Sequence, residues 1–594
     1  MTSIQSYVTS GACTSTQGIK CEIVLPAGST SLLRPSLYGE LSINSLVAGA
    51  ASVVPCPVAI AFSGASASSR GTIRGDQTAY RFLNISGNHY LGSTVRVEIS
   101  DVNISHFGRG LDVMNGGAVI LSQVGSVLVQ RSAFTGNSAM NGGALFIHQV
   151  VTSGVTISSS NFTWNNAVYP TGHIWDHGHY YDPADFETGD GGAVYISRCT
   201  NVLVSKSLFV DNIAGDSGGG MYIFRSTNVA TKDCLFRYNS ASNGWGGGAI
   251  MYYYSTNVLL ANSTLANSLL PGAVQYGGGA VGSYFCNVFT IDTCLFENNH
   301  ILHQGGSGAA AVFSQTPGIS IVHTVFRGNK ALQNGGAMTF YAGCNNVFIS
   351  KCLFQRNGLS TIRAGPADVA QGGALMFEIL TGVMVVDSIF DHNEAIVGGA
   401  ICALYGVHDM AFVNCSFVGN GAHTNLTNNE YITDVSGGAM YLDEVSGLTI
   451  TGCTFTNNYA TRNGGVGFFA GCSDFVFSGI NATGNSAGIS GGVFHFAAET
   501  PRISITQSSF TKNRAADKGG VLYFGSLVSL VSVMGSTFEG NSATSDGGAL
   551  YFDNEATLIS IGGYQVGHAH HRPSLHPSIY TFAHPFAHPF THPS

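Results

Sequence analysis

The chain repeats itself with a period of about 27 residues, and this repeat constrains its fold more than any other feature. The segment "FTGNSAMNGGALFIH" at 134–148 returns as "FEGNSATSDGGALYFD" at 538–553. Each copy has an F-x-x-N tetrad, a short polar link, and Gly-Gly-Ala or a close variant. The tetrads begin at Phe134, Phe162, Phe209, Phe236, Phe296, Phe326, Phe354, Phe390, Phe417, Phe455, Phe510 and Phe538. With weaker copies included, the sequence contains about fifteen units.

The segments between these motifs predict short β-strands. Apolar residues alternate with polar ones, as at Leu145/Ile147 and Val202/Val204, and two or three such runs fill each unit and leave no room for a helix. Stacked units bury a continuous core, with each strand pairing in parallel with its copy about 4.8 Å away. The sequence therefore predicts an all-β fold, a single-stranded right-handed parallel β-helix (solenoid) of about fifteen rungs of about 27 residues each.

The repeat divides the chain into three parts. Residues 1–85 are expected to form a leading segment or cap, and residues 86–562 the β-helix. Residues 563–594 are a low-complexity tail rich in His and Pro, which we expect to be disordered.

The composition excludes some classes of function. Charged residues are 10% of the chain and the formal net charge is −9, so there is no basic footprint for nucleic acid. The sequence contains no run of about 18 apolar residues, the length that a membrane-spanning helix needs. The start, "MTSIQSYVTSGACTS", shows no secretory signal. Because this conflicts with the location that the repeats suggest, we expect the sequence to be truncated.

Asparagine and glycine recur where the chain must turn. Gly-Gly-Ala suits a corner that needs a positive φ or close packing of successive rungs. In several rungs an Asn stands just before a Val, where stacked amides can hydrogen-bond along the axis. This predicted structural ladder comprises Asn201, Asn228, Asn257, Asn287 and Asn346. The Asn of F-x-x-N, as at Asn137, is expected to form a second ladder.

The cysteines give little information on redox compartment. Those two residues before a motif Phe point inward with period two, and of these only Cys415 and Cys453 occupy adjacent rungs, as a disulfide would require. Most are therefore expected to be small buried side chains. Cys13, Cys21 and Cys56 are better disulfide candidates, and the sequence leaves their state open.

The pairing of F-x-x-N with Gly-Gly-Ala, from about Phe107 to Phe552, resembles the chlamydial polymorphic membrane proteins. The resemblance implies an extracellular or cell-surface β-helix that works in adhesion, with a protein or glycan ligand at a cell surface or in the matrix. It also implies a leader and a C-terminal β-barrel, neither of which we recognise in the sequence.

The insertions that lengthen the link after Asn165, Asn357 and Asn420 leave the same corner of the repeat, so they are candidates for a binding surface. The longest reads "YPTGHIWDHGHYYDPADFETGD". Its predicted binding residues are Trp175, His177, His179, Tyr180 and Tyr181. Its His and acidic residues could coordinate a metal, but their spacing matches no zinc pattern. We therefore predict no metal and no cofactor.

Two further columns of residues are open to a functional interpretation. Three residues before the motif Phe, His323, Lys351 and Asp387 could act as acids and bases of a polysaccharide lyase or hydrolase. Ion pairing on a solvated face explains them as well, and we predict a non-enzyme with the polysaccharide-acting enzyme as the alternative. The second column should point outward and either stabilise the sheet or contact a ligand: Phe146, Tyr195, Tyr222, Tyr441, His495, Tyr523 and Tyr551.

Overall fold

The structure, a computed structural model, describes residues 114–563 apart from 169–188, 243–245, 272–276, 303–305, 360–370, 424–434, 498 and 554–555. Before residue 114 it describes 19–25, 30–32, 41–44, 58–64, 71–74, 82–86 and 95–108, and after residue 563 it describes 565–566. Within these ranges there is no helix, and so none that is long and apolar enough to cross a membrane.

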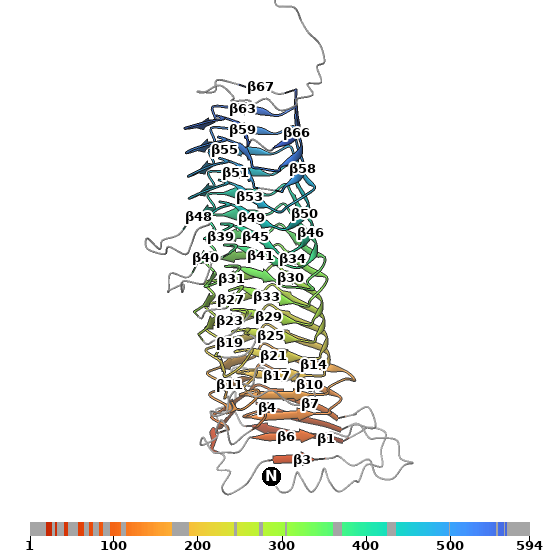
Figure 1. The fold of residues 1–594 in the computed structure, drawn as a ribbon. Helices are drawn as coiled ribbons and strands as arrows, with labels where there is room; N and C mark the ends of the chain where they lie inside the picture. Colours follow the sequence, from red (N-terminus) through yellow and green to blue (C-terminus); the bar gives the residue numbers. More distant parts are fainter. Residues whose placement is uncertain are drawn as a thin grey trace, which may run out of the picture. The chain divides into compact units, whose positions relative to one another are not determined.

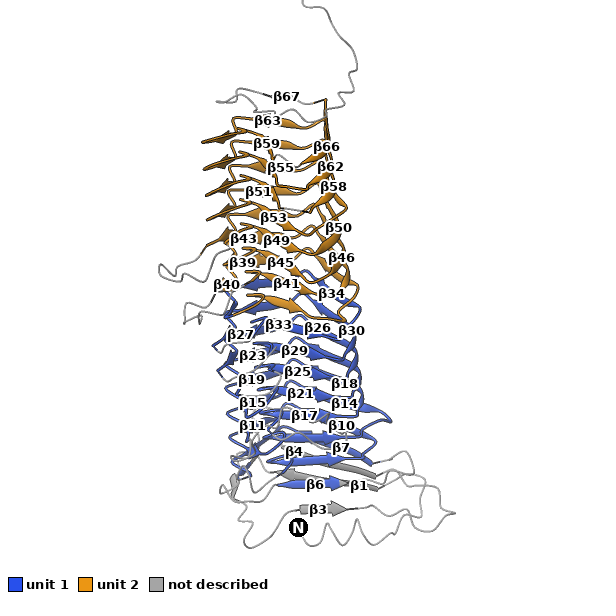
Figure 2. Ribbon diagram, viewed as in Figure 1, with its two compact units in different colours: residues 1–332 blue, residues 333–594 orange. Residues whose placement is uncertain are grey.

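The chain divides into two compact units, unit 1 (Met1–Leu332) and unit 2 (Gln333–Ser594), coloured separately in Figure 2. In each unit, short strands pair in parallel with strands one turn further along the chain, as can be followed by the labels in Figure 1. The predicted all-β parallel solenoid is confirmed.

One turn of unit 1 shows how the repeat maps onto the fold. It runs through β18 (Thr200–Ser205), β19 (Leu208–Val210), β20 (Ile213–Ala214) and β21 (Met221–Phe224). The next turn repeats the order as β22 (Thr227–Lys232), β23 (Leu235–Arg237), β24 (Ser240–Ala241) and β25 (Ile250–Tyr253). Each strand pairs in parallel with its counterpart. The first strands of successive turns form sheet A, the second strands sheet B, the third strands sheet D and the fourth strands sheet C.

Parallel pairing also includes strands from the predicted leading segment. In sheet A, β1 (Ile19–Leu25) pairs with β4 (Val58–Gly64), and β4 pairs with β7 (Val95–Ser100). The strands before residue 86 therefore add turns to the same solenoid. At the other end, β66 (Thr557–Gly562) pairs with β62 (Ser529–Met534). The tail beyond residue 566 lies outside the described residues.

The phenylalanine of the repeat fills the interior. Phe162, Phe209 and Phe236 are fully buried at the centres of successive sheet B strands, with ring centroids 4.8 and 4.6 Å apart. In unit 2, Phe390 lies 4.8 Å from Phe354 and 4.7 Å from Phe417 in the same way. The spacing is that of parallel strands, so each ring stacks on its copy in the next turn.

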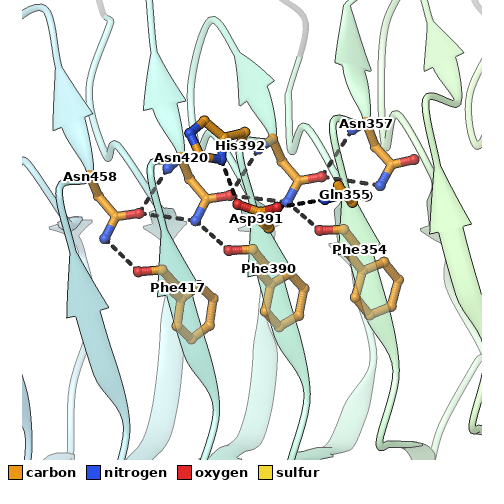
Figure 3. A network of polar contacts seen from close by, with 10 residues as sticks. Phe354, Gln355, Asn357, Phe390, Asp391, His392, Phe417, Asn420 and Asn458 are labelled. Atoms are coloured by element: carbon orange, nitrogen blue, oxygen red, sulfur yellow. Dashed lines mark hydrogen bonds and ion pairs between the residues drawn. The ribbon is translucent and has the colours of Figure 1, made fainter.

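The asparagine of the repeat forms a buried ladder, which confirms the second predicted ladder. Figure 3 shows it in unit 2. The Asn420 amide nitrogen donates to the Phe390 carbonyl and to Oδ1 of Asn458, both at 2.9 Å. Its Oδ1 accepts from the backbone N–H and the amide of Asn393, both at 3.0 Å. Each side chain thereby satisfies backbone groups that a turn would otherwise leave unpaired inside the protein.

The two glycines of Gly-Gly-Ala are required for different reasons. Gly398 has φ 62°, in the left-handed region that glycine favours. A Cβ on Gly399 would lie 2.2 Å from the carbonyl oxygen of Gly438 and 2.5 Å from that of Gly421, so the backbones of adjacent turns leave no room for a side chain. The first glycine therefore makes the corner and the second allows the turns to approach.

The cysteines before the motif Phe belong to a column of hydrogen-bonding side chains. In this column the Ser160 N–H donates to Oγ of Ser207, and the Cys415 N–H to Sγ of Cys453 at 3.3 Å. Each side chain in turn donates to the carbonyl two residues earlier, as Ser207 does to Ser205. The cysteines whose side chains the structure describes are buried thiols, so Cys415 and Cys453 form no disulfide. The side chains of Cys13, Cys21 and Cys56 lie outside the described residues.

Candidate binding surface

The corner between sheets C and A of unit 1 carries a column of unusual side chains. The first corner residue follows β13 (Leu145–His148), β17 (Val194–Ser197), β21, β25, β29 (Val281–Tyr284) and β33 (Ala311–Ser314) in turn. These corner residues are Gln149, Arg198, Arg225, Tyr254, Phe285 and Gln315. The first five donate their backbone N–H to the carbonyl of the last residue of the equivalent strand in the next turn, as Arg225 does to Tyr253 at 2.9 Å. Successive residues of this column therefore lie one turn apart.

Two aromatic rings of this column face solvent. Tyr254 is 42% exposed and Phe285 is 41% exposed, and their rings stack with centroids 4.8 Å apart and planes inclined by 11°. Half-buried Tyr253 packs edge-on against both rings, and Phe224 lies 5.8 Å from Tyr253. The four side chains make one continuous aromatic surface.

Arginine lies against this aromatic surface. The Arg225 guanidinium carbon is 5.1 Å from the centroid of Phe224 and 5.5 Å from that of Tyr254, a cation–π arrangement with both. Arg198 occupies the same corner one turn earlier. Among the residues that the structure describes, neither guanidinium is in an ion pair. We call Arg198, Phe224, Arg225, Tyr253, Tyr254 and Phe285 the aromatic–arginine patch.

The charge around the patch has one sign. In the corner segments 148–154, 197–201, 224–228, 253–257, 284–288 and 314–318, the sequence has the two arginines and His148 but no carboxylate. The corresponding corners of unit 2 carry the carboxylates of Glu378, Asp409, Glu444 and Asp474, the last of which is paired with Arg502. A positive corner in a chain of net charge −9 is a local departure from the repeat.

Burial and the positive charge of Arg198 together shift the titration of His148, the last residue of β13. Burial first, and then the nearby guanidinium, lower the pKa of His148 from 6.5 to about 4. Its Nδ1 lies 2.8 Å from Oγ of Ser197. His148 is therefore neutral at neutral pH, and the positive charge of this corner comes from the two arginines.

An exposed asparagine ladder runs beside the patch. The Asn228 amide donates to Oδ1 of Asn201 at 3.1 Å, and the Asn257 amide to Oδ1 of Asn228 at 2.8 Å. The prediction that Asn287 continues this ladder is wrong, because Asn287 lies in register with Thr256 and Val288 occupies the ladder position. The prediction relied on an Asn that precedes a Val, whereas membership of the ladder depends on the register of the paired strands.

Asn346 holds the same corner position in unit 2, with φ 60°. In the next turn that position is Gly382, since Val347 pairs with Val383. A glycine has no amide to continue the row, so Asn346 has no side-chain partner on the side of Gly382.

The patch residues contribute nothing that the turn itself requires. Tyr254, Phe285 and Val288 have φ of 50°, 53° and 56°, in the left-handed region that suits Gly and Asn and disfavours bulky side chains. Sequence reasoning missed the patch because it looked for insertions. The available signal was an aromatic pair at a corner position where the neighbouring turns have Gln and Arg.

The sequence-predicted binding residues Trp175, His177, His179, Tyr180 and Tyr181 lie outside the described residues. The insertion leaves after β16 (Asn166–Ala167), and the chain returns at Asp190, whose carboxylate accepts the Ser217 N–H at 3.1 Å. The two ends of the insertion are therefore tied to neighbouring turns.

The residues considered for catalysis are exposed corner residues. His323 is in unit 1, Lys351 and Asp387 are in unit 2, and all three have positive φ at the corner between sheets A and B. Nδ1 of His323 lies 3.4 Å from Oδ1 of Asp292, and Asp387 accepts from Asn414 at 3.4 Å. These are contacts along a solvated face, where a paired charge contributes little.

The predicted outward aromatic column is largely covered. Phe146, Tyr195 and Tyr222 point outward as predicted but are buried, with ring centroids 4.9 and 5.1 Å apart, so in unit 1 they stabilise the sheet and offer no contact face. In unit 2 the reason is visible: Met376 and Cys402, at the same outward position, pack against Ile396 and Val397 from the link. The link folds over the outer face of sheet C. Tyr441, His495, Tyr523 and Tyr551 of unit 2 are half-buried.

Comparison with known proteins agrees with the repeat. The family model for the right-handed beta helix region matches residues 85–288, and the model for the Chlamydia polymorphic membrane protein repeat matches residues 535–553. The chain is thus a right-handed parallel β-helix that carries a repeat of this type, which confirms the resemblance drawn from the motifs.

Two relatives match part of the chain. The metabotropic glutamate receptor-like protein R of Dictyostelium discoideum is 27% identical over 202 residues, 34% of this chain and 11% of the relative. The probable autotransporter YfaL of Escherichia coli (strain K12) is 28% identical over 220 residues, 35% of this chain and 16% of the relative. The chain therefore matches less than a fifth of either protein.

Solved structures with a similar fold are distant. A double mutant of the periplasmic alginate epimerase AlgG has 11% identity and a TM-score of 0.24, with 86% of this chain and 78% of that one covered. A mutant of the PL6 family alginate lyase AlyGC has 9% identity and a TM-score of 0.20, with 92% and 97% covered. Similarity this low says nothing of a ligand or a reaction for this chain.

Proposed function

We propose that this chain is a non-enzymatic, adhesin-like binding scaffold that is secreted or displayed at a cell surface. The match to the polymorphic membrane protein repeat and the similarity to a probable autotransporter support the location. The regular ladders of Phe, Asn and Gly support a scaffold role, because they stabilise a long uniform surface and leave function to the positions that depart from the repeat.

The observation that carries the proposal is the exposed aromatic–arginine patch. Tyr, Trp and Arg are the residues that dominate binding energy at protein surfaces, and here two exposed rings and an arginine without a carboxylate partner are held together on rigid turns. The residues considered for catalysis are by contrast solvated and belong to two different units.

A binding assay with the purified full chain tests the proposal. We expect saturable binding to cell monolayers or isolated matrix, displaced by unlabelled protein. No displaceable binding to any cell or matrix preparation would contradict the proposed function. In parallel, incubation with pectin and alginate, with and without calcium, should release no unsaturated sugar. Release of product that is lost in Lys351→Ala would make the chain an enzyme.

The longest insertion provides a second test. Replacing 169–188 with a short Gly/Ser link keeps β16 and Asp190, which contact neighbouring turns. The circular dichroism spectrum should therefore not change. We propose that Trp175, His177, His179, Tyr180 and Tyr181 contribute contacts to the same ligand, so this variant should bind cells more weakly. Unchanged binding would exclude the insertion from the site and leave the patch as the binding surface.

A further inference from the structure

We propose that the aromatic–arginine patch of unit 1 binds an anionic polysaccharide, one whose sugar rings carry carboxylate or sulfate groups. This inference rests on the proposed function, since it names the class of ligand that the scaffold would bind. The patch supplies the three kinds of contact that such a polymer needs, and each comes from different side chains.

The first contact is with the faces of the sugar rings. The stacked rings of Tyr254 and Phe285 each leave about two fifths of the residue open to solvent. The C–H groups on one face of a sugar carry partial positive charge and pack on the negative face of an aromatic ring. Because the rings stack on each other and Arg225 lies over Tyr254, a sugar would pack against the parts and edges of the rings that remain exposed. The two rings belong to adjacent turns, so these exposed parts follow one another along the corner.

The second contact is with the anionic groups. Arg225 is held over Phe224 and Tyr254, which fixes its guanidinium beside the rings, and Arg198 adds a second positive charge one turn away. A planar guanidinium can bind a carboxylate or sulfate through two parallel hydrogen bonds. Because the corner segments of unit 1 contain no carboxylate, nothing there competes with the anion of a ligand.

The third contact is with hydroxyl groups. Asn201, Asn228 and Asn257 are exposed, and each bond along their ladder uses one N–H and one lone pair. Every primary amide has two N–H groups and a carbonyl oxygen with two lone pairs, so each of these side chains retains hydrogen-bonding capacity. Thr227 and Thr256 add exposed hydroxyls one residue earlier. The polar rows therefore lie beside the rings, where the hydroxyls of a bound sugar would be.

The same corner elsewhere in the chain shows what the fold alone requires. Gln149 and Gln315 hold the column position in other turns of unit 1, so neither an aromatic ring nor a charge is needed for the turn. In unit 2, Tyr405 has the same left-handed conformation, with φ 60°, and is 55% exposed. It lies among Glu378, Asp409 and Glu444, which would repel an anionic polymer. Tyr405 is therefore a matched control.

Three variants of the full chain test the proposal. The first is Tyr254→Asn with Phe285→Asn, which removes the rings but keeps residues suited to a positive φ. The second is Arg198→Gln with Arg225→Gln, which reproduces the side chain of neighbouring turns. The third is the control, Tyr405→Asn. Binding is measured by calorimetry to polygalacturonate, heparin, uncharged dextran and a single-stranded oligothymidylate, and the two acidic polymers distinguish carboxylate from sulfate.

We expect the unmodified chain to bind at least one acidic polysaccharide and not dextran. The ring variant and the arginine variant should each weaken that binding at least tenfold, and only the arginine variant should also reduce its salt dependence. Tyr405→Asn should bind like the unmodified chain. All three variants should keep the melting temperature within a few degrees, because Asn and Gln suit these corner positions.

Several results would overturn the inference. Equal binding of dextran would remove the role of charge, and preference for the oligothymidylate would point to single-stranded nucleic acid. Unchanged affinity in the ring variant would reduce the site to a nonspecific positive surface. These outcomes are separable from failure of the proposed function. Cell binding that persists in both patch variants overturns the inference, because the patch is then not the binding surface, but it leaves the scaffold function standing, whereas absence of any cell binding by the unmodified chain refutes the function.

Discussion

Replacing one buried asparagine of the ladder should open the turn around it. We expect Asn420→Leu, similar in size but unable to hydrogen-bond, to remove the four side-chain bonds of Asn420 in unit 2. Three buried groups lose a partner: the Asn393 N–H, one amide N–H of Asn393 and the Phe390 carbonyl. Oδ1 of Asn458 still accepts from the backbone N–H of residue 420. At about 1–3 kcal/mol for each buried unsatisfied group, three groups cost about 3–9 kcal/mol, and we expect the lower half of that range, about 3–5 kcal/mol, because the turn can relax around the Phe390 carbonyl.

Hydrogen exchange followed by mass spectrometry measures this cost locally, which suits a repeat array because it need not unfold in one step. Amides of the turns from Phe390 to Asn458 should lose protection by roughly a hundred- to a few-thousand-fold, since each 1.36 kcal/mol is a factor of ten. The matched control is Asn414→Gly in the same turn. Asn414 is exposed with φ 53°, and its counterpart in the next turn is already Gly452, with φ 64°. Its replacement should cost less than about 0.5 kcal/mol.

Asn420→Asp tests the same contacts through the direction in which its stability changes with pH. Ionised, the new carboxylate would face the Phe390 carbonyl and Oδ1 of Asn458, so its pKa in the folded state should lie above its unfolded value. The variant should therefore be most stable below the unfolded pKa of about 3.9 and lose stability as the pH rises through the folded pKa. If Asn420→Leu lost no more protection than Asn414→Gly, or if Asn420→Asp were equally stable across this range, the ladder would not stabilise the turns as argued.

Three further predictions concern the glycine corner, a histidine and the thiols. Gly399→Ala should destabilise unit 2 by about 2 kcal/mol or more, because its Cβ would meet backbone oxygens, whereas Gly479→Asn, at φ 62° with open space, should be tolerated in a denaturant titration. Burial lowers the pKa of His495 from 6.5 to about 4, so unit 2 should keep its full stability above pH 6.5 and lose up to about 3 kcal/mol as the pH falls toward 4. The His495 ring stacks between the rings of Phe468 and Tyr523, so His495→Phe keeps an aromatic ring there without a group to protonate. In thermal melts this variant should lose less stability as the pH falls. Burial also raises the pKa of Cys199 and Cys472 to about 12, so native protein treated with iodoacetamide should show no labelling of the buried cysteines by peptide mapping, and labelling without denaturant would contradict their burial.

The periodic features of this protein could be read from the sequence because each repeats many times. A single F-x-x-N tetrad means nothing, but a column of twelve with Gly-Gly-Ala in phase permits only a structure in which equivalent residues stack. The stacking of Phe390 on Phe417, the buried Asn420 amide and the close approach at Gly399 all follow from that one argument.

The sequence reading failed where position depended on more than the period. Asn287 precedes a Val as Asn257 does, yet strand register places it one residue away from the ladder. The sequence predicts that the cysteines before the motif Phe are small and buried, but it does not show that their column exchanges hydrogen bonds with the backbone of adjacent turns. The alternation of apolar and polar residues along the strand places Tyr195 on the outer face of sheet C, but it does not reveal that this face is covered.

The solenoid follows from the repeat alone, because a repeated unit that buries little surface by itself must stack on its copies. Which outward residues meet solvent was decided only by tertiary structure, because that depends on how each link and corner lies over its neighbours. Tyr195 and Tyr254 both point away from the interior, yet Tyr195 is 2% exposed and Tyr254 is 42% exposed. The candidate binding surface is therefore apparent only in the structure, where the corner of unit 1 brings two rings and an arginine from three successive turns together.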